Sequence, residues 1–187
     1  MKKILALAVV ALASVCASAQ NFYVGGQAGF WHESNSSKVT NTLTILPEVG
    51  YNLNDSWAIG TTLGYEYNHL CGAGISGHIF QFNPYARWTF FKSSNNLVNL
   101  FVDGGAGVGA GWTHYSGGDD SKTACVWNIG LKPGVALNLT DRFSVVAHLG
   151  LLGYEGANDA AKSAGYKDQG GLLLNGNNIK LGFYYHF

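Results

Sequence analysis

Alternation of apolar and polar residues dominates the chain, and the last seven positions show it most clearly. One parity carries an apolar, aromatic set (Leu181, Phe183, Tyr185 and Phe187), and the other carries Gly182, Tyr184 and His186. A period of two is typical of a β-strand with one apolar face. An apolar strand at an open sheet edge invites aggregation, whereas a closed barrel pairs its last strand with its first. This segment therefore predicts the closing strand of a barrel.

The same alternation recurs along the rest of the chain. With the last segment included, the expected strands cover about 22–31, 43–53, 57–67, 80–90, 98–112, 125–139, 143–151 and 171–187. Each run alone is a weak signal, so the prediction rests on their sum. We therefore expect an all-β fold, an eight-stranded antiparallel up-and-down transmembrane β-barrel.

Connections between the expected strands alternate in length. Short turns are expected at 54–56, 92–96 and 140–142, and longer segments rich in Gly, Ser, Asn and Asp at about 33–41, 68–77, 114–122 and 155–170. Bacterial barrels combine short periplasmic turns with longer outer loops. Both chain ends are then expected on the periplasmic side.

Charged residues inside the expected strands separate a membrane barrel from a soluble one. All six of them, Glu48, Glu66, Arg87, Asp103, Lys132 and Lys180, have the parity opposite to the apolar set. A soluble lipocalin-like barrel, the main alternative, would turn its charges outwards. An Arg or Lys facing lipid at the midplane would cost about 2 to 4 kcal/mol. The pattern therefore predicts a polar interior and an apolar exterior.

Aromatic residues of the apolar parity gather at both ends of the expected strands. Trp57, Trp88, Phe90, Phe143, Tyr185 and Phe187 lie near the short turns, and Tyr65, Tyr67, Trp112 and Trp127 lie near the long loops. Two such belts are typical of strands that cross a bilayer, because amphipathic rings favour the interface.

The N-terminal segment has the pattern of a cleaved export signal. Lys2 and Lys3 precede a largely apolar run of twelve positions at 4–15, and Ala17-Ser18-Ala19 supplies a small-x-small cleavage site. A spanning helix needs about twenty residues. Cys16 raises the alternative of a lipoprotein, but Val15 is bulkier than the residue that a lipobox requires before the cysteine. We therefore reject lipidation at Cys16. We expect residues 1–19 to be a signal peptide and 20–187 to form the barrel domain.

Composition excludes several classes of function. The chain has 11 basic and 11 acidic residues, and loss of Lys2 and Lys3 leaves 9 and 11, a net charge of −2. No basic surface for nucleic acid follows from that balance. Charged residues are 12% of the chain, and no apolar run after the signal approaches the length of a membrane helix. No phosphate loop or pair of catalytic carboxylates occurs, and neither cofactor nor metal is predicted.

The interior charges are expected at nearly one level of the barrel. Glu48, Arg87, Asp103, Lys132 and Lys180 lie about four to seven residues from the short turns, and Glu66 lies nearer the loops. Because an unpaired buried charge costs several kcal/mol, these charges must pair. We expect Arg87 and Lys132 to contact Glu48 or Asp103, with Arg87 facing Glu48 and Lys180 completing the layer. The layer either plugs the lumen or gates it.

Glycines and cysteines add two smaller expectations. Gly105, Gly107, Gly109 and Gly111 all have the inward parity, where glycine indicates a close neighbour. The expected occupants are large inward side chains such as Tyr85, Phe91 and Trp31, with a ligand channel as the alternative. Cys71 and Cys125 are the cysteines outside the export signal, and either a disulfide or two free thiols fits the sequence.

The alternating aromatics that end at Phe187 resemble the closing strand of Gram-negative outer-membrane β-barrels, and the mature chain is similar to OmpX and to the barrel domain of OmpA. The resemblance implies that Phe183, Tyr185 and Phe187 form the assembly signal read by the insertion machinery. It also implies export to the outer membrane, contact with membrane lipid and lipopolysaccharide, and a monomer. The lumen of the OmpA barrel carries a comparable salt-bridge network, and the gating alternative comes from that resemblance.

Family roles include adhesion, serum resistance, envelope integrity and slow diffusion. We expect a structural or surface-interaction role through the outer loops, with an unidentified extracellular partner. A narrow gated pore is the alternative.

A lipid A-modifying enzyme is the third reading. His114-Tyr115-Ser116 resembles the His-x-Ser pair of a lipid A deacylase family, with Asp119 or Asp120 to orient the imidazole, but Gly117 replaces the Asn that follows in that family. His69, Cys71 and His78 are too few for a complete metal site. We therefore expect no enzymatic activity.

Overall fold

The computed structural model describes residues 21–35, 38–71, 74–115, 122–163, 165–173 and 179–187. The expected signal peptide and Cys16 lie outside these residues. The elements are β1 (Phe22–Asn35), β2 (Lys38–Asn52), β3 (Trp57–Cys71), β4 (Ile75–Lys92), β5 (Val98–Tyr115), β6 (Lys122–Asn138), β7 (Phe143–Leu149), β8 (Leu151–Ala157), α2 (Asp159–Ser163), β9 (Gln169–Leu173) and β10 (Ile179–His186). Among the residues described, no helix has the length and hydropathy of a membrane-spanning helix.

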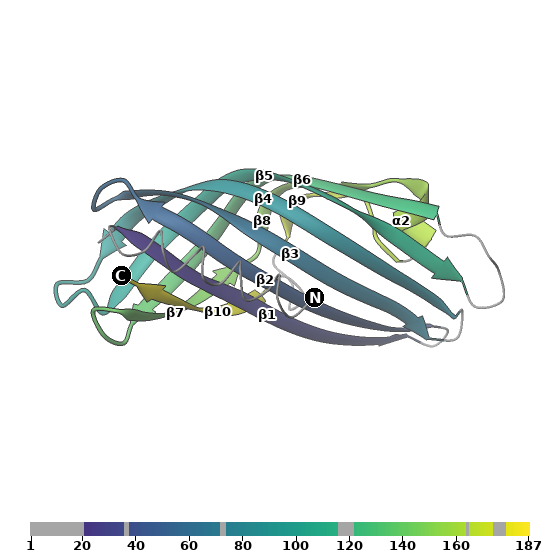
Figure 1. Ribbon diagram of the computed structural model, residues 1–187, viewed down its shortest axis with the longest axis horizontal. Helices are drawn as coiled ribbons and strands as arrows, with labels where there is room; N and C mark the ends of the chain where they lie inside the picture. The colour runs from purple at the N-terminus through teal and green to yellow at the C-terminus, as the bar shows by residue number, and fades with distance from the viewer. Residues whose placement is uncertain (1–20, 36–37, 72–73, 116–121, 164, 174–178) are drawn as a thin grey trace, which may run out of the picture.

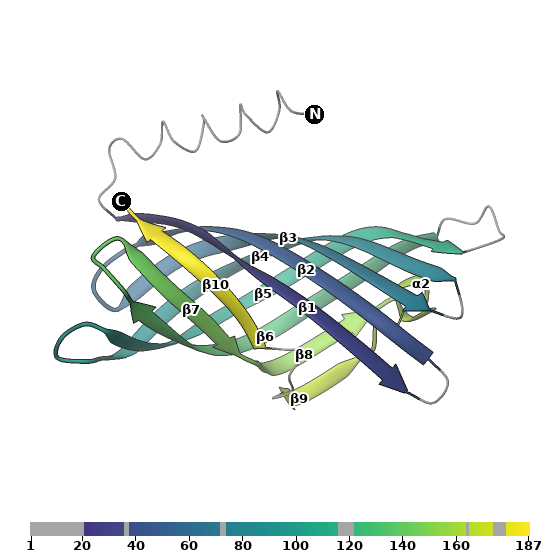
Figure 2. The same ribbon diagram turned by 90° about the horizontal axis from the view of Figure 1, so that it is seen from below.

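The strands form a closed antiparallel barrel and slant around one long axis (Figures 1 and 2). We call each wall element of the barrel, whether one strand or two successive strands, a stave. β1 pairs with β10 from Tyr23 opposite His186 to Ala28 opposite Leu181, which joins the first stave to the last. β7 and β8 both pair with β6 and are separated by Gly150, whose φ is 137°. β10 and β9 pair in turn with β7 and β8. Ten segments therefore make eight staves, and the predicted eight-stranded barrel is confirmed.

The strands reach further towards the long-loop end than the sequence predicts. β1 continues to Asn35 and β2 begins at Lys38, so most of the expected loop at 33–41 is strand. The expected loops at 68–77 and 114–122 are shortened in the same way, and 155–170 contains the end of β8, α2 and the start of β9. Backbone pairing does not require apolar side chains, so polar residues can continue a hairpin where the alternation stops.

The two faces of the barrel are as predicted. Phe30 and Phe183, on the outward parity, are 69% and 67% exposed, whereas the inward Glu48 and Asp103 are 5% and 4% exposed. Trp57 and Trp88 stack on the outer face near the short turns, with ring centroids 6.2 Å apart. A soluble barrel would carry the opposite arrangement.

Inward side chains pack against one another across the lumen on the short-turn side. Tyr23, Ala58, Phe101, Ala136, Val146 and Tyr184 form one buried cluster. A Cβ at Gly60 would overlap the ring of Tyr85, and one at Gly50 would overlap Tyr23, so glycine makes room for both rings.

Of the three occupants expected inside, Tyr85 also packs beside Gly105. The prediction that Phe91 lies inside is wrong, because the register shift between Thr89 and Phe91 leaves its side chain 49% exposed. The side chain of Trp31 lies outside those that the structure describes.

Candidate functional site

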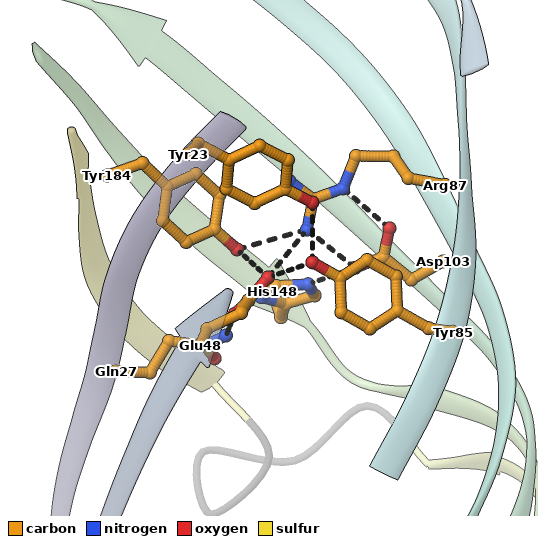
Figure 3. A network of polar contacts seen from close by, with 8 residues as sticks. All are labelled: Tyr23, Gln27, Glu48, Tyr85, Arg87, Asp103, His148 and Tyr184. Atoms are coloured by element: carbon orange, nitrogen blue, oxygen red, sulfur yellow. Dashed lines mark hydrogen bonds and ion pairs between the residues drawn. The ribbon is translucent and has the colours of Figure 1, made fainter. Parts of the chain in front are cut away.

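A polar network crosses the lumen near the short turns (Figure 3). Eight side chains from opposite walls converge there, and we call them the lumen network: Tyr23, Gln27, Glu48, Tyr85, Arg87, Asp103, His148 and Tyr184. β1, β2, β4, β5, β7 and β10 each supply at least one of them. They meet because alternate residues of every stave point inwards.

Arg87 is the centre of the network, and Asp103 is its main partner. Arg87 Nε lies 2.7 Å from Asp103 Oδ1, and Nη2 lies 2.8 Å from Oδ2, a two-point contact between residues directly opposite each other on β4 and β5. Nη2 also lies 3.4 Å from Glu48 Oε1. One cation is thus shared by two buried carboxylates, and charge-assisted bonds of this kind are the strong ones.

Tyrosine hydroxyls complete the coordination of Glu48. Tyr85 and Tyr184 both donate to Oε1, the latter at 2.7 Å, and Gln27 Nε2 donates to Oε2 at 2.9 Å. Tyr23 OH lies 2.5 Å from Tyr85 OH and extends the chain of hydroxyls to β1. Together with Arg87, donors from three strands therefore hold a carboxylate that would be costly to bury alone.

His148 and Phe101 close the remaining sides of the network. His148 Nε2 lies 2.8 Å from Asp103 Oδ2, and its ring meets Phe101 edge-on with centroids 5.3 Å apart. The guanidinium carbon of Arg87 lies 4.0 Å from the centroid of Phe101. Aromatic rings and hydrogen bonds thus surround the cation.

The predicted charge layer is only partly assembled. Glu48, Arg87 and Asp103 lie together, but Arg87 bonds chiefly to Asp103, where Glu48 was expected. Lys132 lies directly opposite Asp103 on β6, yet neither Lys132 nor Lys180 has an ion-pair partner within 4.0 Å among the residues described. The guanidinium fork occupies both oxygens of Asp103, which a single ammonium cannot do.

Glu66 lies apart from the lumen network, as its position along β3 implies. Its Oε2 accepts a bond of 3.3 Å from Gln81 Nε2. His148, Gln27, Tyr23 and Tyr184 were not predicted as partners of the charge layer, and Tyr85 was predicted inside only as a neighbour of the inward glycines. Their inward parity was readable, but the partners of the charge layer were sought among charged residues alone.

Cavities lie on both sides of the lumen network. The one towards the short turns has a volume of about 650 Å³ and reaches Tyr23, Arg87, Phe101 and Tyr184. The one towards the long loops has about 80 Å³ and reaches Glu48, Tyr85, Asp103 and His148. The lumen network is therefore a thin barrier between two cavities.

The segment between β8 and β9 folds against the inward face of the barrel at the loop end. Ala161 of α2 is fully buried against Ile79, Ala124 and Ala157. Thr113 Oγ1 donates to the carbonyl of Ala160 at 3.2 Å, which ties α2 to β5. The predicted long loop is thus partly an internal element, and α2 covers part of the loop end of the lumen.

A salt bridge fastens this segment, with Lys162 Nζ 2.5 Å from Asp168 Oδ2. The bond from Lys162 and a second from the Ala157 amide lower the pKa of Asp168, and the same bridge raises the pKa of Lys162. A lowered carboxyl pKa adds stability that is lost as pH falls through it, and a raised amine pKa adds stability that is lost as pH rises through it. The bridge should therefore act between about pH 4 and about pH 10.

We predict that acid loosens α2 before it unfolds the barrel. Hydrogen exchange of the 159–163 amides, corrected for intrinsic rates, should quicken below about pH 4 because Asp168 becomes protonated. Asp168→Asn should exchange faster already at neutral pH, whereas the neighbouring Lys167→Ala serves as a control and should change little. Equal exchange in wild type and Asp168→Asn at every pH would contradict the role of the bridge.

The remaining candidate residues are those considered for catalysis, for a disulfide and for a metal. Ser116, Asp119 and Asp120 lie outside the described residues, and His114 is exposed. Cys71 on β3 and Cys125 on β6 are free thiols, so the structure supports the second of the two cysteine alternatives. No group of three potential metal ligands occurs in the described part of the chain.

Comparison with known proteins gives a family and a set of folds. The family described as "Outer membrane protein beta-barrel domain" matches residues 4–187. Neisserial surface protein A (NspA) is similar in fold, with a TM-score of 0.52 and 17% identity over 89% of this chain and 97% of that one. No curated protein sequence matches the chain.

Two further solved structures resemble the chain more distantly. A major outer membrane protein from Thermus thermophilus has a TM-score of 0.48 and 16% identity over 89% of this chain and 98% of that one. Ail, the attachment invasion locus protein of Yersinia pestis, has a TM-score of 0.36 and 15% identity over 88% and 91%.

Proposed function

The chain belongs to the outer membrane protein β-barrel family, and we propose that it is a closed scaffold that presents its loop end to partners outside the cell. Its place is the outer membrane. The observation that carries the proposal is the lumen network, because Arg87, Glu48 and Asp103 are all buried and bonded to residues from several strands. A lumen filled in this way supports a resting barrel that conducts no solute and whose function lies on its surface.

The loop end suits such a role in its geometry. β4 and β5 have 18 residues each and β6 has 17, whereas about 9 to 11 residues cross the apolar band. The hairpins therefore extend well past the lipid as paired strands, which hold their tips in fixed positions. NspA is named a surface protein, and a surface role for this chain is consistent with that name.

Replacement of the loop segments tests the proposal. Segment 116–121 exchanged for a Gly-Ser sequence of equal length should remove adhesion of expressing cells to extracellular matrix or their survival in serum. The barrel should still fold, because the replacement leaves every residue of the described β5–β6 pairing unchanged, from Val98 opposite Leu137 to Thr113 opposite Lys122. Equivalent replacement of the turn at 140–142, at the other end, is the matched control. A surface role would be contradicted if only the control replacement removed both properties, or if neither replacement removed them.

A gated pore is the second candidate, and the thinness of the barrier favours it. The two cavities approach the lumen network from opposite sides, so one rearranged layer would connect them. Single-channel recording in planar bilayers distinguishes a permanent plug from a gate, and the decisive variant is Arg87→Ala, treated in the Discussion.

Assembly and lipid contacts complete the proposal. We propose that the barrel is inserted by the outer-membrane assembly machinery through β10, stands as a monomer, and contacts lipopolysaccharide in the outer leaflet. Catalysis on lipid A is the reading we favour least. Mass spectrometry of lipid A from cells expressing wild type or Ser116→Ala tests it, and we expect identical spectra.

A further inference from the structure

Two lysines share the cavity on the loop side of the lumen network. Lys132 comes from β6 and Lys180 from β10, and both line the space of about 80 Å³. Among the described residues, neither ammonium group has a hydrogen bond or an ion pair. Two like charges therefore face one small space without a bonded counter-charge.

Other donors already hold the nearest carboxylates of the lumen network in place. Asp103 accepts bonds from Arg87 Nε and Nη2 and from His148 Nε2. Glu48 accepts from both Tyr85 and Tyr184 on Oε1 and from Gln27 on Oε2. Neither carboxylate is free to turn towards a lysine without breaking bonds that a buried group needs.

The rest of the lining offers no bonded counter-charge either. Glu155 also lines the cavity, but its Oε2 accepts a bond of 2.7 Å from Gln169, and no ion pair joins it to either lysine. The amides of Asn128, Asn83 and Gln81 form a relay in which each donates to the next, ending on Glu66. Most polar side chains of the wall therefore have hydrogen-bond partners. Within the described part of the chain, the groups of the lining without one are the two ammonium groups, the Thr62 hydroxyl and the buried His148 Nδ1.

We propose that this cavity binds one small monovalent inorganic anion, such as chloride, between Lys132 Nζ and Lys180 Nζ. A bound anion would offset the repulsion of two ammonium groups in a space of low dielectric, where that repulsion is stronger than in water. A space of this size holds an ion with one or a few waters, which favours a halide over a bulky organic anion. The inference is independent of the surface role.

Bromide locates the site directly because it scatters anomalously and mimics chloride. Crystals of the folded barrel grown in sodium bromide should show an anomalous peak between the two amines. Lys132→Met with Lys180→Met keeps most of the side-chain length, removes both charges and should abolish the peak. The exposed Lys92→Met, at the turn end, is the matched control and should retain it. No peak in wild type, or an unchanged peak in the double variant, would overturn the proposal.

Unfolding by urea in detergent gives a second readout that does not depend on crystals. At constant ionic strength, replacing gluconate by chloride in the buffer should raise the folding equilibrium constant of wild type. Near saturation the rise should be about tenfold per tenfold increase in chloride. The double variant should show no such dependence, whatever its absolute stability, and Lys92→Met should follow wild type. Equal chloride dependence in wild type and the double variant would refute a site between these lysines.

Discussion

Replacement of Phe187 by Asp is expected to leave the protein unassembled in the periplasm and sensitive to protease. β10 is the stave that closes the barrel, since it pairs with β1 on one side and β7 on the other. Phe187 continues its outer face, with its amide 3.1 Å from the Phe22 carbonyl and its ring edge-on to Tyr185 at 4.9 Å. A carboxylate there disrupts both the aromatic belt and the signal that we propose the insertion machinery reads. Heat-modifiable migration on gels measures assembly.

Phe143→Asp is the control that separates the two causes. Phe143 lies opposite Tyr185 on the neighbouring stave, and their rings are 5.1 Å apart. A charge at Phe143 enters the same belt at the same level but leaves Phe183, Tyr185 and Phe187 intact. We expect this variant to assemble, with lower stability. If both variants fail to assemble to the same extent, the cause is exposure of a charge to lipid, and the result does not support an assembly signal. Normal migration of the Phe187 variant would contradict the prediction outright.

The inward and outward faces were predictable because a membrane barrel makes parity costly to violate. Lipid rejects a charge on the outer face, so Glu48 could be placed inside from its position relative to Ile45 and Val49, and Arg87 from its position relative to Phe82 and Trp88. The same period predicted the closing strand at 181–187. These features depend on local alternation, which is written into consecutive residues.

Features that depend on distant residues were not predictable in this way. The break at Gly150 divides one stave into β7 and β8, yet glycine is common throughout the chain. Burial of Ala161 requires Ile79 and Ala124 from other staves, so a polar segment that sequence reads as a loop becomes an internal element. The choice of carboxylate that bonds to Arg87 depends on strand register and on the shape of the guanidinium. The alternation of residues along a strand gives information on neither.

The second large effect concerns Arg87, whose replacement by Ala should lower the free energy of unfolding by about 3 to 5 kcal/mol. The loss is large because Glu48 and Asp103 would stay buried, at 5% and 4% exposed, without their shared cation. Urea unfolding in lipid vesicles measures it. Arg142→Ala is the matched control, because that residue is exposed at the turn end and its side chain bonds only to Tyr185 OH, at 3.3 Å, among the described side chains. Its cost should stay within about 0.5 kcal/mol.

Neutralising the two acids tests whether uncompensated charge is the cause. Arg87→Ala combined with Glu48→Gln and Asp103→Asn should recover much of the stability lost in Arg87→Ala alone, since neutral groups no longer require a cation. No recovery would mean that packing around Phe101 and Tyr23 carries the effect.

Conductance of the same Arg87→Ala barrel decides between plug and gate. If the aromatic rings that surround Arg87 still fill the lumen, the folded variant should conduct no more than wild type. A higher single-channel conductance in the folded variant would show that the charged layer alone separates the two cavities, and the pore would then replace the closed scaffold as the function best supported.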